Sequence, residues 1–134
     1  SVTIPLGQAA VRRAGSDITI VSWSKQALVC AAACDTLAAQ GIQAELIDLR
    51  TIWPWDRDTV LASAAKTGRL LVVHEAIQAA GFGAEIAATA AEATGCKISR
   101  LGAPRIPVGY APVLEAQSRV TADAIVARVQ QLLG

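Results

Sequence analysis

The stretch RLLVVHE, residues 69–75, decides the fold, because four consecutive aliphatic residues lead directly into the only histidine of the chain. A short, continuous apolar run of this kind is typical of a strand that is covered on both faces. Gly68 stands directly before the run, and a glycine- and alanine-rich stretch follows it from Gly81 onward. We therefore expect a buried strand of a parallel sheet, with helices on either side.

Outward from this stretch, strand patterns and helix patterns alternate along the chain. The other predicted strands are residues 17–23, 42–49 and 96–102, and the predicted helices are residues 24–41, 57–68, 81–94 and 121–133. Ser24, Asp56 and Thr121 are the expected N-caps, and Gly41 and Gly68 are the expected helix stops. Residues 1–14 are expected to form an arm or an edge strand, since Pro5 disfavours a central strand.

This alternation predicts an α/β fold, a three-layer αβα sandwich with a mostly parallel sheet of about five strands and helices on both faces. We expect one domain over residues 1–134. In such a sheet, functional residues gather beyond the carboxyl ends of the strands. The loops RTIWPWD (50–56) and HEAIQAAGFG (74–83) are expected at that edge.

The composition limits the classes of partner. Hydrophobic residues make up 53% of the chain and charged residues 17%, which predicts closely packed helices and a face meant for a partner. The net charge of +1 is scattered, so we expect no nucleic acid partner. No apolar run approaches the ~18 residues of a membrane span, so we expect no membrane partner. The chain has no methionine, and we expect it to be a fragment of a longer polypeptide.

The cysteines do not indicate a metal site. Cys30 and Cys34 would share one face of a helix, but no second pair of ligands follows at a workable spacing for zinc. An odd number of cysteines favours reduced thiols in an intracellular compartment. We interpret them as small buried apolar residues.

His74 and the glycines do not form a catalytic or nucleotide-binding motif. On a strand, His74 and Glu75 point to opposite faces, so they cannot act together as a base and its orienting carboxylate. We interpret His74 as a structural or interface residue. The GFG of residues 81–83 begins a dinucleotide fingerprint, but the third glycine position holds Ile86. We interpret the two glycines as allowing a sharp loop and the close approach of a helix start to another backbone.

The loop between the second predicted strand and the next helix is unusual. Trp53 and Trp55 bracket Pro54 in a chain with five aromatic residues in all. We expect one indole to seal the edge of the sheet above a helix. The other is then available as an interface anchor, a role in which tryptophan is enriched.

Three segments carry a family resemblance. They are AELIDLRTIWPWDRDTVLASAAKTGRLLVVHEA (44–76), GFGAEIA (81–87) and PVGYAPVLE (107–115), preceded by IPLGQAAVRRAGSDITIVSWS (4–24). Together they resemble the C-terminal domain of the β subunit of thiamine-diphosphate-dependent 2-oxo acid dehydrogenases, within the wider transketolase C-terminal domain family. The segments RTIWPWD and HEA are more similar to the branched-chain type than to the pyruvate type.

The resemblance implies an intact enzyme that uses thiamine diphosphate and magnesium to decarboxylate a branched-chain 2-oxo acid or pyruvate. The acyl group then passes to a lipoyl arm of the acyltransferase component. In the family, the diphosphate motif requires Gly-Asp-Gly followed by asparagines and belongs to the α subunit, and this chain has no asparagine. The domain is therefore expected to bind no cofactor, to contain no catalytic residue and to be inactive alone. The expected location is the bacterial cytoplasm or the mitochondrial matrix.

The family assigns assembly to this domain. The implied partners are a second β subunit, the α subunit and the subunit-binding domain of the acyltransferase. The candidate interface residues are Arg50, Trp53, Trp55, His74, Glu75, Phe82 and Tyr110. Two alternatives stay open at this point: a flavodoxin-like module that binds a nucleotide or another small ligand, and the same domain in another thiamine enzyme, such as an acetoin or pyruvate dehydrogenase.

Overall fold

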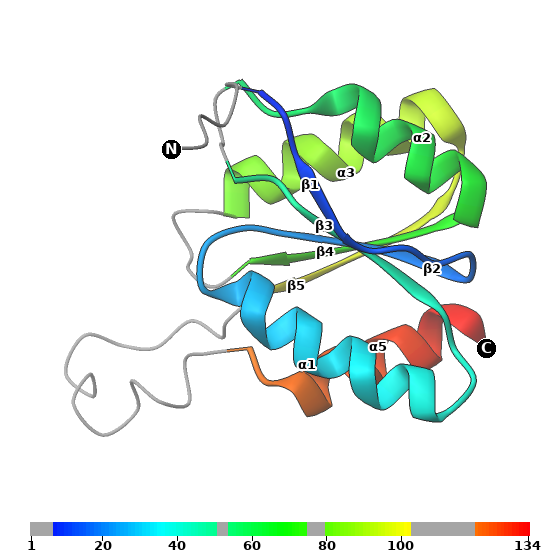
Figure 1. Cartoon of the computed structure of the whole chain (residues 1–134). Coiled ribbons are helices and arrows are strands. Elements are labelled where there is room, and N and C mark those ends of the chain that lie inside the picture. The colour runs from blue at the N-terminus through cyan, green and yellow to red at the C-terminus, as the bar shows by residue number, and fades with distance from the viewer. Residues whose placement is uncertain (1–6, 51–53, 75–79, 103–119) are drawn as a thin grey trace, which may run out of the picture.

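The computed structural model describes residues 7–50, 54–74, 80–102 and 120–134, in which five strands and four helices alternate (Figure 1). The strands are β1 (Ala10–Arg13), β2 (Ile18–Ser22), β3 (Ala44–Asp48), β4 (Arg69–His74) and β5 (Lys97–Gly102). The helices are α1 (Gln26–Ala39), α2 (Arg57–Thr67), α3 (Ala80–Thr94) and α5 (Ala122–Leu133). The alternation predicted from the sequence is confirmed.

The five strands form one sheet in the order β1-β3-β2-β4-β5. All neighbours pair in parallel except β1, which lies antiparallel to β3 at one edge. Helices α2 and α3 cover one face, and α1 and α5 cover the other (Figure 1). The three-layer αβα sandwich is therefore confirmed. The chain runs from β2 to β3 on one side and returns past β2 to β4, so β2 and β4 flank the point where the strand order reverses.

Strand β4 explains why the run RLLVVHE is continuously apolar. Leu71 and Val73 pack in the core beneath α1 and α5, whereas Leu70 and Val72 pack in the core beneath α2 and α3. All four side chains are fully buried. His74 continues the alternation of Leu70 and Val72 and so lies on the face that carries α3.

Two of the predicted N-caps are confirmed. The side chain of Asp56 accepts a hydrogen bond from the Thr59 amide at 3.1 Å, and that of Thr121 accepts one from the Ala124 amide at 3.2 Å. Gly68 ends α2 at a φ of 75°. A left-handed φ is easily adopted by glycine, which is why α2 stops there.

The prediction that Ser24 caps α1 is wrong. The helix begins at Gln26, and Lys25 occupies the N-cap position without a side-chain hydrogen bond to the helix. Ser24 has a φ of 59°, whereas an N-cap residue normally has extended backbone angles. Its carbonyl instead accepts a hydrogen bond from the Ala27 amide at 3.2 Å, so a turn precedes the helix.

Candidate functional site

The carboxyl ends of β2, β3, β4 and β5 lie at one edge of the sheet, which we call the carboxyl edge. Four predicted site residues are described, and all belong to this edge or pack beside it: Arg50, Trp55, His74 and Phe82. The other three, Trp53, Glu75 and Tyr110, lie outside the described residues. The edge is therefore the place to search for a site.

His74 is enclosed between two glycines. Its side chain ends β4, and the residue is 8% exposed. A Cβ atom added to Gly102 would lie 2.1 Å from His74 Cε1, and one added to Gly83 would lie 3.2 Å from His74 Cδ2. The imidazole thus occupies the space that side chains at these two positions would fill, and it sets the separation between β4, β5 and the start of α3.

This arrangement corrects the interpretation of the GFG segment. Gly83 makes the expected close approach, but it approaches the side chains of His74 and Val72 rather than another backbone. Gly81 lies inside α3 and has open space around its α-carbon, so it is not the pivot of a sharp loop. The sequence indicated the close packing without revealing that the lone histidine causes it.

Three aromatic side chains close the carboxyl edge on the α2 and α3 face. Phe82 makes edge-to-face contacts with Trp23 at 5.1 Å and with Trp55 at 6.1 Å between ring centroids. Both tryptophans are 7% exposed, and the Arg57 guanidinium lies 5.9 Å above the Trp55 ring. Trp55 therefore packs mainly within this chain, and its role at a subunit interface stays a prediction. Trp23 was missed because it closes a strand pattern that reads as core.

The backbone is strained at two neighbouring positions of the edge. Among the described residues other than glycine, only Ser24 and Arg50 have a positive φ, 59° and 62°. They follow β2 and β3, which pair side by side, and the Arg50 amide donates a hydrogen bond to Asp48 Oδ1 at 3.0 Å. Left-handed angles at such residues are uncommon and concentrate at functional positions. The strain therefore marks this part of the edge as a candidate site.

A groove of about 350 Å³ opens beside this strained backbone, between α1 and strands β1 and β3. It is lined by Arg12, Ser24, Ala27, Leu28, Ala31, Leu46 and Asp48. Leu46 is buried, Leu28 is 76% exposed, and an ion pair of 3.3 Å joins Arg12 and Asp48. An apolar centre with a charged border is the usual composition of an interface patch. We call this feature the α1 groove.

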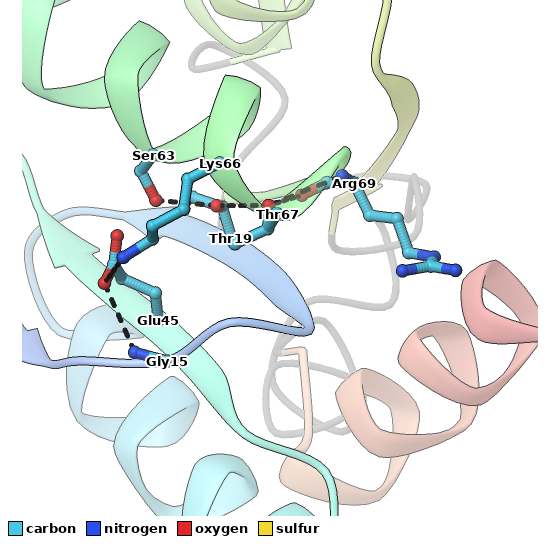
Figure 2. Close-up of polar contacts among 7 residues, drawn as sticks. All are labelled: Gly15, Thr19, Glu45, Ser63, Lys66, Thr67 and Arg69. Carbon is cyan, nitrogen blue, oxygen red and sulfur yellow. Dashed lines mark hydrogen bonds and ion pairs between the residues drawn. The ribbon is translucent and has the colours of Figure 1, made fainter.

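A buried chain of hydroxyl groups lies beneath α2, away from the predicted site (Figure 2). Thr19 Oγ1 on β2 lies 2.6 Å from Ser63 Oγ and 2.8 Å from Thr67 Oγ1, both on α2. Thr67 Oγ1 also donates to the Arg69 carbonyl at 2.9 Å. Because hydrogen bonds satisfy these buried hydroxyl groups, the hydroxyl groups together hold α2 on the sheet.

A buried carboxylate belongs to the same layer (Figure 2). Glu45 Oε1 accepts hydrogen bonds from Lys66 Nζ at 2.6 Å and from the Gly15 amide at 3.2 Å. Burial raises the pKa of Glu45, but hydrogen bonds from Lys66, Ser63 and Gly15 and the charge of Lys66 outweigh it, so the pKa lies below its usual value. The alternation of side chains along β3 places Glu45 on a buried face, and this alternation is the sequence pattern that could have identified the residue. The group holds α2, β3 and the β1–β2 connection together.

Replacing Glu45 by glutamine should make the stability less dependent on pH. The pKa of Glu45 in the folded state lies below its usual value of 4.5, so its ionised form stabilises the folded state. This contribution is complete above the unfolded pKa and is lost as the pH falls through the folded pKa. At neutral pH we expect Glu45→Gln to lower the free energy of unfolding by about 1 kcal/mol.

Urea denaturation at neutral pH and at about pH 3.5 measures this effect. The variant Lys66→Met tests the same pair from the other side, because it removes the cation and keeps the hydrocarbon stem. Both variants should lose less stability on acidification than the unmodified chain. Equal losses in all three proteins would contradict the assignment of this pH dependence to Glu45.

Two of the three cysteines are unsuited to reactivity. Burial raises the pKa of Cys30 to about 12 and that of Cys34 to about 11, so both thiols stay protonated. This agrees with the interpretation of these two as small buried apolar residues, whereas Cys96 is only partly buried. No group of three or more His, Cys, Asp and Glu side chains is placed to hold a metal ion in the part of the chain that the structure describes. Within the same part, no helix has the length and apolar character to cross a bilayer.

Comparisons with known proteins agree on one family. The family model described as Transketolase, C-terminal domain matches residues 7–125. The chain is 54% identical over 89 residues to the mitochondrial 2-oxoisovalerate dehydrogenase subunit beta 2 of Arabidopsis thaliana, which covers 66% of this chain and 25% of that protein. It is 38% identical to the acetoin:2,6-dichlorophenolindophenol oxidoreductase subunit beta of Bacillus subtilis, over 98% of this chain and 40% of that protein.

A solved structure of similar fold covers almost the whole chain. It is a split-gene transketolase in an inactive β4 tetramer, with a TM-score of 0.86 and 26% sequence identity over 98% of this chain and 44% of that one. The chain therefore spans less than half the length of each of these proteins, between 25% and 44%.

Proposed function

The chain belongs to the transketolase C-terminal domain family, and from this premise we propose that it is the assembly and docking domain of the β subunit of a 2-oxo acid dehydrogenase. The family resemblance found in residues 44–76 is thereby confirmed. The proposed reaction of the intact enzyme is the oxidative decarboxylation of a branched-chain 2-oxo acid. The 54% identity to a 2-oxoisovalerate dehydrogenase subunit over 89 residues supports this substrate class.

The observation that carries the docking role is the strained backbone beside the α1 groove. Ser24 and Arg50 both have a positive φ. Ser24 lines this groove, and Arg50 lies two positions after Asp48, which also lines it. Holding these angles costs about 1–2 kcal/mol for each residue other than glycine. A surface that keeps such strain next to an exposed leucine is better explained by recognition than by packing within the chain.

The proposed partners are a second β subunit, the α subunit and the subunit-binding domain of an acyltransferase. The similar split-gene transketolase forms a tetramer of four beta chains, and this supports self-assembly of the fold. Arg50, whose guanidinium can form paired hydrogen bonds with a carboxylate, is the proposed anchor for an acidic group of a partner. His74, enclosed by Gly83 and Gly102, is proposed as a structural residue at the carboxyl edge.

We propose that thiamine diphosphate and magnesium serve the intact enzyme and that this domain supplies no ligand to them. A magnesium ion requires carboxylate or similar oxygen ligands. Among the described residues, the carboxylates that follow β3 and precede α2 are already engaged, because Asp48 pairs with Arg12 and Asp56 caps α2. The donor groups of the described edge therefore do not fit a magnesium diphosphate, and no reaction step is assigned to this chain.

A calorimetric titration of this chain with the subunit-binding domain of the cognate acyltransferase tests the docking role. We expect saturable binding to that domain and no heat of binding from thiamine diphosphate with magnesium. Two variants form a matched pair, because glycine adopts a positive φ without strain. Arg50→Gly removes a cation and should weaken binding about tenfold, whereas Ser24→Gly relieves the same kind of strain but keeps every charge and should weaken binding less.

Absence of partner binding, or saturable binding of the cofactor, would contradict the proposal. Equal effects of Arg50→Gly and Ser24→Gly would contradict the role of the arginine. Circular dichroism of both variants checks that the fold is kept.

A further inference from the structure

Strand β1 has less contact with the two hydrophobic cores than the other strands. It lies antiparallel to β3 at one edge of the described sheet, and a bulge between Val11 and Arg13 interrupts the pairing (Figure 1). No residue of β1 belongs to either core, whereas β5 at the opposite edge contributes Ile98 and Leu101. A strand with so little core contact adds little to the cohesion of the other four.

Carboxylates of three different elements hold the segment of residues 7–13 instead. Each carboxylate accepts from one donor of the segment, and the pairs are Asp56 with the Ala9 amide at 2.9 Å, Asp48 with Arg12 at 3.3 Å, and Asp35 with Arg13 at 2.6 Å. Both ion pairs are partly exposed, and exposed ion pairs contribute little to stability. The segment is therefore held mainly by polar contacts that water can replace.

The next residues are fixed much more firmly. The amides of Ser16 and Asp17 donate to the Gln43 carbonyl at 3.1 and 2.9 Å. The Gly15 backbone packs so closely on β3 that an added Cβ would lie 2.4 Å from the carbonyl carbon of Ala44. We call residues 15–17 the anchor. Because the anchor stands between β1 and β2, residues 7–13 can leave β3 without displacing β2.

We infer that residues 7–13 form a strap, which we call the β1 strap, and that it opens from β3 as one unit while β2, β3, β4 and β5 stay paired. Local opening of this kind occurs in segments that have few buried contacts. The strap ends at the anchor, and the exposed residue Ala14 joins the two parts.

The position of the strap determines the shape of a groove on each face of the sheet. Arg12 lines the α1 groove, and Val11 lines a second groove, of about 410 Å³, together with Glu45 and Lys66. Opening therefore removes one wall of the α1 groove and uncovers the edge of β3. The consequence for docking rests on the proposed function, whereas the opening itself does not.

Native-state hydrogen exchange of the whole chain, followed by NMR, tests the inference. We expect the Ala9 amide and the β1 amides bonded to β3 to have protection factors at least tenfold lower than those of Ser16 and Asp17. Low concentrations of urea should change the exchange of the strap little, because its opening exposes little surface. The same urea should speed the exchange of β4 clearly.

Two aspartates in the first turn of α2 give a matched pair of variants. Asp56 uses Oδ1 for the Thr59 amide and Oδ2 for the Ala9 amide. Asp56→Asn keeps one oxygen for the helix cap and loses the second acceptor, so strap exchange should become about tenfold faster. Asp58→Asn removes an exposed carboxylate from the same helix turn and should leave strap exchange unchanged.

Arg13→Gln tests whether the strap moves as one unit. It removes the ion pair with Asp35 and should speed exchange of the Ala9 amide about threefold, although Ala9 lies four positions away and bonds to Asp56. A change confined to the amides next to residue 13 would overturn the unit.

Strap amides that exchange as slowly as those of Ser16 and Asp17 would overturn the inference. Equal effects of Asp56→Asn and Asp58→Asn on strap exchange would also overturn it. All of these measurements use the free chain, whereas the docking role is tested by titration with the acyltransferase domain. The two proposals therefore fail by different measurements.

Discussion

Replacing Gly15 by alanine should lower the free energy of unfolding by about 3 kcal/mol or more, at the upper end of the range for overpacking a close contact. A Cβ atom at this position would lie 2.4 Å from the carbonyl carbon of Ala44 and 2.6 Å from the carbonyl oxygens of Ala44 and Gln43. All three are backbone atoms at the start of β3. They cannot rotate away as the end of a side chain can, so the two chain segments must separate.

The separation would also break hydrogen bonds. The Gly15 amide donates to Glu45 Oε1 at 3.2 Å, and the amides of Ser16 and Asp17 donate to the Gln43 carbonyl at 3.1 and 2.9 Å. These bonds hold the β1–β2 connection against β3. Their partial loss adds to the steric cost of the new methyl group.

Thermal unfolding measures the effect. For a chain of 134 residues, about 3 kcal/mol corresponds to a fall in Tm of about 10 °C. Gly81→Ala is the matched control, since a Cβ there meets no atom within 4 Å and the residue lies in α3. It should stabilise the chain by about 0.5–1 kcal/mol, because alanine is the better helix former. A Tm for Gly15→Ala within about 2 °C of the unmodified value would contradict the prediction.

Most of the fold could be predicted from the sequence because local patterns and the global fold agree. The apolar run of residues 69–75 required cover on both faces, and its side chains indeed divide between two cores. Asp56 and Thr121 act through neighbours three residues away, so their capping could be read locally. The role of Ser24 could not be predicted in this way, because its backbone conformation is set by the connection between β2 and α1 rather than by its own side chain.

The candidate site was predictable in place but not in composition. The rule that sites gather at carboxyl ends of parallel strands predicted the edge at which the structure places Arg50 and His74, and their functional role stays a prediction. The α1 groove was missed because Leu28 lies in a helix that is apolar on both faces, where no pattern separates a buried leucine from an exposed one. The contact of Thr19 with Ser63 joins residues 44 positions apart, so no local signal predicts it.

The second large effect is expected at Gly102, where alanine should lower the free energy of unfolding by about 2–3 kcal/mol. The new Cβ would lie 2.1 Å from His74 Cε1, 2.6 Å from Nε2 and 2.7 Å from Nδ1. The imidazole cannot simply turn toward α3, because Gly83 already approaches its opposite side. Either the ring leaves its position or β5 moves away from β4.

A double-mutant cycle separates this clash from a general loss of packing, with urea denaturation as the measurement. His74→Ala alone removes the ring and should cost about 2 kcal/mol through the cavity it leaves. In the variant carrying both His74→Ala and Gly102→Ala, the new methyl group enters that cavity. The combined cost should therefore fall below the sum of the two single costs by about 1–2 kcal/mol.

Gly83→Ala is the control on the other side of the ring. Its Cβ would lie 3.2 Å from His74 Cδ2, a contact that a small shift relieves, and alanine also favours the helix. Its cost should therefore be less than that of Gly102→Ala. If the two glycine variants cost the same, or if the costs of His74→Ala and Gly102→Ala simply add, His74 does not set the separation of α3, β4 and β5. A greater cost for Gly102→Ala than for Gly83→Ala, together with a non-additive cycle, would instead establish that His74 sets the packing of α3, β4 and β5 at the carboxyl edge.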